Sequence, residues 1–151
     1  MNQKILILGL VGILILPAFV LANEHHQKGG GIDDMYFGKA RFYLAHQDEL
    51  GLSKDQVEKI TAMKYDVKRA SVEANAKKDL AMIDFKQELH TDKPDLTKLE
   101  AAIDQKMAAK TDLYKKAAKA IVDTKALLSA DQTVKAKELY RQKKSDWKMK
   151  R

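Results

Sequence analysis

Apolar residues recur at alternating intervals of three and four along two long stretches of this chain. The stripe of the first stretch, which extends from Ser53 to about His90, is Ile60, Met63, Val67, Ala70, Ala74, Ala81, Phe85 and Leu89. The stripe of the second, which follows Asp95, is Leu96, Leu99, Ile103, Met107, Tyr114, Ala117, Ile121 and Leu128. Such spacing gathers apolar side chains on one face of a helix. Because no segment alternates with period two, we predict an all-α fold.

The two long helices are separated by the sequence "TDKPD" at 91–95. Pro94 disfavours helical backbone at Lys93, and Asp95 is a good N-cap for the helix that follows. At 1.5 Å per residue the first is a rod of roughly 55 Å, and the second is about as long. We therefore expect an elongated antiparallel hairpin, similar to a coiled coil, rather than a compact globule.

Two shorter helices complete a predicted set of four. One extends from Asp34 to about Leu50 and ends at Gly51, a residue type typical of the position after a helix. The other begins near Ser129 and continues toward the end of the chain. The predicted helical domain is thus residues 34–151.

The sequence "LSKDQ" at 52–56 is repeated as "LSADQ" at 128–132. In each copy the serine and the glutamine three residues later have the spacing of a capping box, which begins a helix. The aspartate adds negative charge in the first turn, where the helix dipole favours it. The motif residues are Leu52, Ser53, Gln56, Leu128, Ser129 and Gln132.

Residues 1–22 have the features of a secretory signal peptide: an early lysine, an apolar stretch, and small residues before a cleavage site after Ala22. The apolar stretch is near the lower length for a spanning helix, so an uncleaved anchor is the alternative. We expect a flexible Gly-rich segment at 23–33. The chain has no cysteine, so an exported, periplasmic product would depend on helix packing rather than disulfides.

Alanine is frequent in both long stripes, and it contributes little buried area. A single hairpin of such helices has one thin contact layer. We therefore expect a homodimer that buries a second helix face.

The chain has a formal charge of +7, which falls to about +6 without the signal peptide. A basic exported protein could bind nucleic acid, an anionic membrane surface or acidic proteins. We find no base-reading motif and expect no nucleic acid partner. Lysine pairs such as Lys77-Lys78 and Lys115-Lys116 are spread along the chain, which also fits an ordinary solvated helix face.

The signal sequence, the four helices and the paired Leu-Ser-x-Asp-Gln starts together resemble the Spy/CpxP family, whose repeated motif is Leu-Thr-x-x-Gln. That family includes periplasmic ATP-independent chaperones, the zinc-resistance-associated protein and CnrX-like heavy-metal sensors. The resemblance covers about residues 33–142, and Ser53 and Ser129 replace the family's threonine. It implies a cradle-like antiparallel dimer. It also implies stressed envelope proteins as partners, with a membrane sensor or regulator as a further one.

The stretch "YLAHQDELGLSKDQVEKI" at 43–60 is similar to the sensor branch, which binds nickel or cobalt through a His-x-x-x-His pair. His46 occupies the second of those positions, but Phe42 occupies the first. His90 is roughly 50 Å away along the helix, too far to share an ion. His46 is therefore either a metal ligand or a capping, partly buried structural residue.

We expect a periplasmic ATP-independent chaperone or envelope-stress adaptor, and no enzymatic activity. The alternative is a heavy-metal sensor or resistance protein for nickel, cobalt, copper or zinc. Exposed aromatic and basic side chains suit adaptable contact with unfolded clients. The predicted client-binding residues are Tyr36, Phe37, Phe42, Tyr43, Lys64, Lys68 and Arg69. These aromatic residues could instead close the hairpin core.

Cleavage after Ala22 would place Asn23-Glu24-His25-His26 at the start of the mature chain. The α-amine, two backbone amides and the His25 imidazole can then arrange four nitrogens around Cu(II) or Ni(II) in a square plane. No other cofactor is expected. The alternative is a solvated pair, His25 and His26, on a Gly-rich tail.

Overall fold

The computed structural model describes residues 30–149, which form five helices and no strand. They are α1 (Ile32–Ala45), α2 (Gln47–Leu50), α3 (Lys54–Leu89), α4 (Leu96–Leu127) and α5 (Ala130–Met149). The predicted signal peptide, His25, His26 and most of the Gly-rich segment lie outside the described residues. Between residues 30 and 149, no helix has the length and the hydrophobicity that a membrane span requires.

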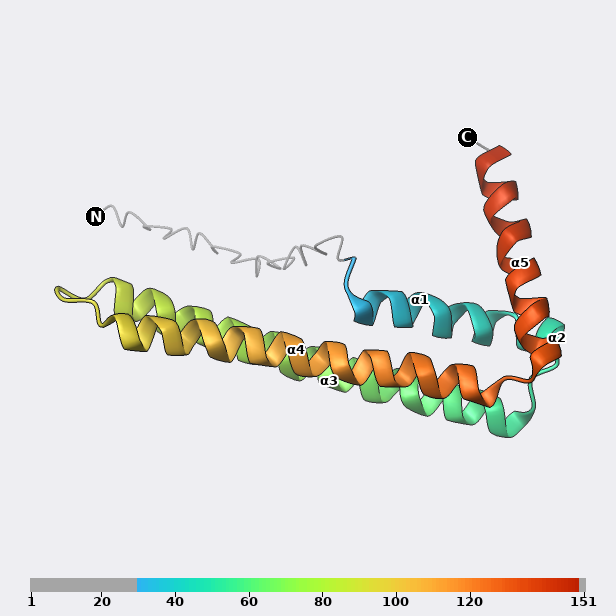
Figure 1. The fold of residues 1–151 in the computed structure, drawn as a ribbon, viewed down its shortest axis with the longest axis horizontal. Helices are drawn as coiled ribbons and strands as arrows, with labels where there is room; N and C mark the ends of the chain where they lie inside the picture. The colour runs from blue at the N-terminus through green and yellow to red at the C-terminus, as the bar shows by residue number, and fades with distance from the viewer. Residues whose placement is uncertain (1–29, 150–151) are drawn as a thin grey trace, which may run out of the picture.

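The long helices α3 and α4 form an antiparallel hairpin, as predicted (Figure 1). α4 begins where the sequence indicated, because the Asp95 carboxylate accepts a hydrogen bond of 2.9 Å from the Thr97 backbone N–H. Glu88 supports the turn by accepting a 2.9 Å hydrogen bond from the Asp95 backbone N–H. α1 lies along the half of the hairpin distant from this turn, and the other half remains two helices thick (Figure 1).

The prediction of one helix over residues 34–50 is wrong. The helix begins at Ile32 and breaks at His46, where φ is −115°, before the short α2 continues to Leu50. The break redirects the chain so that Leu50 becomes buried. Gly51 has the left-handed φ of 63° expected of a residue that ends a helix, and α2 ends there as predicted.

The core lies between α1 and the α3–α4 hairpin and continues between the two long helices. It consists of Tyr36, Ala40, Ile60, Val67, Ala74, Ala109, Leu113, Ala117 and Ala120. Five of these nine residues are alanines, so the helices approach closely and bury little area per residue. The thin core predicted from the alanine content is confirmed, whereas dimerisation remains a prediction.

The predicted buried stripe of α4 is wrong in its first half. Ile103 and Met107 are 48% and 53% exposed, while Ala102 and Ala109 are buried in their place. The small side chains allow α4 to approach α3 closely, so the alanine face turns inward and the bulkier face turns outward. The predicted stripe of α3 is more accurate, since Ile60, Val67, Ala74 and Ala81 are all buried.

Candidate functional site

Both predicted capping boxes form. The Ser53 hydroxyl accepts a 3.2 Å hydrogen bond from the Gln56 backbone N–H, and the Gln56 side chain accepts one of 2.8 Å from the Ser53 backbone N–H. Ser129 and Gln132 repeat this pair at 3.1 and 3.0 Å. Each motif therefore begins a helix, as the sequence indicated.

The two motifs also bond to each other, which the sequence did not predict. Gln56 Nε2 donates to Gln132 Oε1 at 2.9 Å, and Gln132 Nε2 donates back to Gln56 Oε1 at 3.1 Å. The second hydrogen of each amide bonds a carbonyl just before the opposite motif: Gln56 to Leu127 at 2.6 Å, and Gln132 to Gly51 at 2.8 Å.

The paired glutamines join the starts of α3 and α5 by a pseudo-symmetric arrangement. Each amide uses both of its hydrogens and accepts two hydrogen bonds at its oxygen, so its full capacity is satisfied. Such a network stabilises the fold most when every donor and acceptor in it has a partner. The motif repeat is thus a structural joint at the corner where α2, α3 and α5 meet, and it holds the base of α5.

The structure buries Tyr36 completely, which corrects its assignment to client binding. Burial raises the pKa of the Tyr36 hydroxyl, and the neighbouring Thr124 hydroxyl offsets this in part. Thr124 lies near enough to affect this pKa, yet by distance and angle the Tyr36 hydroxyl makes no hydrogen bond to any described residue. The alternative, that the first aromatic residues close the core, is correct for this residue.

Phe37, Phe42 and Tyr43 are half-buried. Phe37 and Tyr43 pack against the core, and burial raises the pKa of Tyr43. The Phe42 ring makes an edge contact with Tyr140 of α5, with ring centroids 5.7 Å apart. These three residues therefore connect helices, and only part of each ring is available to a partner.

The predicted basic residues lie on α3. Lys68 and Arg69 are exposed, and Lys64 is partly buried. The Arg69 guanidinium pairs with the Asp66 carboxylate one turn earlier. The predicted client residues therefore lie on two helices, the aromatic ones on α1 and the basic ones on α3.

An exposed apolar stripe on α3 escaped the sequence prediction. It consists of Tyr65, Val72, Leu80 and Ile83, which are 57%, 58%, 60% and 49% exposed. With Arg69 and Ala76 the positions follow intervals of three and four, so they share one face of the helix. We call this set the α3 outer stripe. A count of both apolar faces of α3 would have found it.

His46 has a side chain that is 16% exposed, and its Nδ1 lies 2.8 Å from Glu49 Oε1. This hydrogen bond holds the pKa of the Glu49 carboxyl below its usual value. The His46 ring also contacts Phe42, with ring centroids 4.8 Å apart. His46 therefore occupies the break between α1 and α2, as the structural alternative proposed.

No group of three or more metal-ligating His, Cys, Asp or Glu residues occurs in the part of the chain that the structure describes. His90 lies at the opposite end of α3 from His46, and its Nδ1 is 2.6 Å from the Lys86 carbonyl oxygen. The residues His25 and His26 of the predicted copper site precede the described range.

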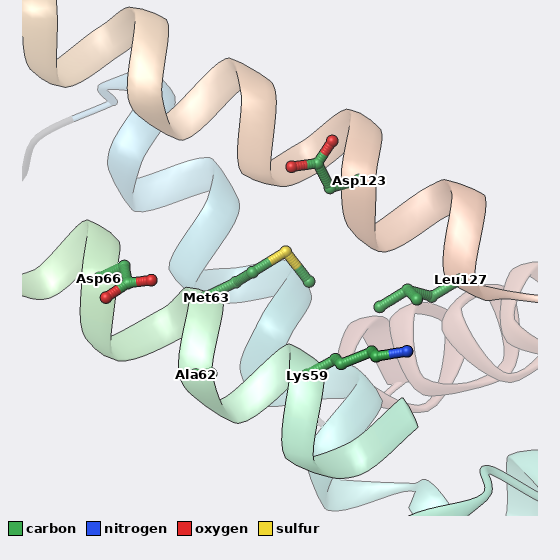
Figure 2. Close-up of a pocket in the computed structure, with 6 residues that line it drawn as sticks. All are labelled: Lys59, Ala62, Met63, Asp66, Asp123 and Leu127. Atoms are coloured by element: carbon green, nitrogen blue, oxygen red, sulfur yellow. The ribbon is translucent and has the colours of Figure 1, made fainter. Parts of the chain in front are cut away.

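A shallow pocket opens between α3 and α4 (Figure 2). Its lining residues are Lys59, Ala62, Met63, Asp66, Asp123 and Leu127. The two carboxylates already pair with cations on their own helices, Asp66 with Arg69 and Asp123 with Lys119. The pocket therefore has an apolar floor between paired charges and no convergent polar groups.

Comparisons of the chain with protein-family models, with curated proteins and with solved structures found no match. The Spy/CpxP resemblance of the paired motifs accordingly remains a prediction.

Proposed function

We propose that this protein is a periplasmic ATP-independent chaperone or envelope-stress adaptor that holds unfolded clients on the outer faces of its hairpin. The observation that carries this proposal is the α3 outer stripe. Its four large apolar side chains are each about half exposed or more, along a helix that α1 covers only in part. Scattered single exposed apolar residues are ordinary, but a row of them on one helix face, with Arg69 as its one charged position, favours a binding role.

The charge around the stripe supports the same function. Arg69 belongs to the stripe by position, and Lys68 and Lys77 are exposed on the same helix. Cations attract acidic segments of a client at long range, and apolar side chains then supply short-range contact. On α4, the exposed Ile103 and Met107 add flexible apolar area of the kind that tolerates varied clients.

The test is suppression of aggregation of a heat-stressed client in the absence of ATP, followed by light scattering. The double variant Leu80→Gln/Ile83→Gln should lose most of the suppression, and the matched variant Lys115→Gln/Lys116→Gln, exposed on α4, should retain it. Circular dichroism checks that both variants stay helical. If a stoichiometric excess of wild-type protein leaves scattering unchanged at low and moderate salt, the proposal is wrong.

A homodimer could cover the same stripe, and the same variants separate the two roles. Sedimentation of Leu80→Gln/Ile83→Gln shows whether assembly changes. A variant that becomes monomeric while its suppression of aggregation is unchanged would assign the stripe to the dimer interface instead of to clients.

The alternative function, a heavy-metal sensor or resistance protein, is favoured by one observation: His46 and Glu49 place two ligand types 2.8 Å apart at a helix break. Calorimetry with nickel, cobalt, copper and zinc tests it. Binding that is lost in His46→Ala and retained in the control His90→Ala would support the sensor function.

A further inference from the structure

The positive charge of the protein is concentrated in its last helix. Residues 130–151 contain eight basic and three acidic residues, a formal charge of +5, whereas residues 30–129 contain 18 basic and 17 acidic ones. The hairpin and α1 are therefore nearly neutral, and α5 with the two residues after it is strongly basic. An asymmetry of this kind indicates an anionic partner for the basic end.

The cations of α5 form a row on one face. Lys137, Arg141, Lys144 and Lys148 follow intervals of four, three and four, which keeps them on one side of a helix over about 16 Å. We call this row the α5 basic stripe. Lys137 and Arg141 are exposed, and among the described side chains neither forms an ion pair.

An ordinary solvated helix face explains the other helices better than it explains α5. On α3 and α4, three oppositely charged pairs at four-residue spacing form ion pairs: Lys54–Glu58, Asp55–Lys59 and Lys119–Asp123. Like-charged pairs at this spacing, such as Lys64 with Lys68, also occur there, but none extends to a row of four. On the α5 basic stripe, neighbours at the same spacings are all positive, an arrangement that weakens an isolated helix. The helix dipole favours cations in the last turn only, so it does not account for Lys137 and Arg141.

The fold leaves α5 free to use this stripe. The helix turns away from the hairpin at the corner held by Gln56 and Gln132, and its far half projects from the rest of the molecule (Figure 1). On the side toward α2, Lys135 and Lys143 are close enough to help lower the pKa of Glu49. Glu49 of α2 thus faces a different set of lysines from those of the stripe.

We propose that α5 binds the surface of an anionic phospholipid membrane through the α5 basic stripe. Four basic positions in line along a projecting helix can meet a flat charged surface together. Rows of basic residues on an amphipathic helix are attracted to anionic headgroups, and the attraction decreases with salt. Tyr140 is 61% exposed beside the row, and an aromatic ring suits the headgroup region.

This inference is independent of the proposed chaperone activity. It concerns where the protein is held, because a helix bound flat on a membrane would leave the hairpin and its α3 outer stripe accessible. It uses surface attraction only, and it requires no segment to cross the membrane.

The test is co-sedimentation of the exported protein, with its N-terminus mapped, with vesicles of phosphatidylcholine alone or mixed with phosphatidylglycerol. We expect binding to the mixed vesicles only, and a decrease as salt rises. The variant in which Lys137, Arg141, Lys144 and Lys148 are replaced by glutamine should bind about a thousandfold more weakly. The matched variant, with Lys77, Lys86, Lys115 and Lys116 replaced by glutamine, should bind like the wild type.

A second measurement does not depend on any variant. Trp147 is the single tryptophan of the chain and belongs to α5, so its fluorescence reports on this helix alone. Its emission should shift to shorter wavelength, and iodide should quench it less, on addition of the anionic vesicles. Unchanged emission with bound protein would overturn the proposal.

Three further results would also overturn it. Equal binding to both kinds of vesicle would show that anionic lipid is not recognised. An equal loss in the matched control would show that diffuse charge is sufficient. Release from the vesicles by polyglutamate at a matched charge concentration, with the same shift of Trp147 emission, would identify an acidic polypeptide as the partner instead.

Discussion

The side-chain amides of Gln56 and Gln132, 76 residues apart in the chain, donate hydrogen bonds to each other at 2.9 and 3.1 Å. Each also caps its own helix and bonds a carbonyl at the base of the other motif. The two copies of a local helix-start motif therefore also form one long-range contact with each other. The joint fixes where α5 leaves the hairpin.

Replacing either glutamine by alanine should lower the free energy of unfolding by about 1–3 kcal/mol, because a backbone N–H and a carbonyl lose their partners. The double variant should lose less than the sum of the two single losses, with a coupling of about 1 kcal/mol. Urea unfolding of the four proteins measures this cycle. Gln87→Ala, at an exposed position of α3, is the control. Strictly additive losses would contradict a shared network.

Tyr36→Phe should stabilise the protein by about 1 kcal/mol, because it removes a buried hydroxyl that lacks a hydrogen-bond partner. Burial raises the pKa of Tyr36, so the unfolded state ionises first as pH rises above the usual value of 10.0. Stability should therefore fall in that alkaline range, and the variant should fall less. Unfolding midpoints at neutral and alkaline pH test this prediction. The control is Tyr65→Phe, whose side chain lies on the exposed face of α3, and it should leave the stability at neutral pH unchanged.

Glu49→Gln should remove part of the decrease in folding stability that the wild type shows at acid pH. The hydrogen bond from His46 lowers the pKa of Glu49 below its usual 4.5, so the folded state favours the carboxylate more than the unfolded state does. The stabilisation is present above that value and is lost as pH falls through the lower folded pKa.

The urea midpoint of the wild type should therefore be higher than that of Glu49→Gln near neutral pH. The two midpoints should converge in acid, and a constant difference would contradict the linkage. Asp48→Asn, at the neighbouring exposed position, is the control.

The thin, alanine-rich core predicts a homodimer whose stability depends on protein concentration. The melting temperature should rise with concentration, and sedimentation should give twice the mass of one chain, which is 17.1 kDa for all 151 residues. A folded monomer at micromolar concentration, with a melting temperature unchanged by dilution, would show that one protomer suffices.

The N-terminal copper site is also open to test. If the mature chain begins at Asn23, it should bind one Cu(II) with the visible absorption band typical of four nitrogen ligands. His25→Ala, or one added residue before Asn23, should abolish that band, and His90→Ala should preserve it. A native N-terminus mapped at any other residue would remove the basis of this site.

The sequence by itself determined the helix starts and the corners. Ser53, Asp95 and Ser129 precede α3, α4 and α5 as predicted, and Gly51 ends α2. These signals are reliable because each depends on hydrogen bonds and backbone conformations within about four residues. The same locality explains why the hairpin of two long helices could be expected from spacing alone.

Only the tertiary structure decided which face of α4 became buried. That helix carries two apolar faces, and periodicity alone cannot rank them. Its alanine face is buried because small side chains permit the closest approach to α3, whereas on α3 the predicted face with Ile60 and Val67 is the buried one. The burial of Tyr36, the break at His46 and the bond between Gln56 and Gln132 have the same origin, since each depends on a partner distant in the chain or on the path the chain must take to reach it.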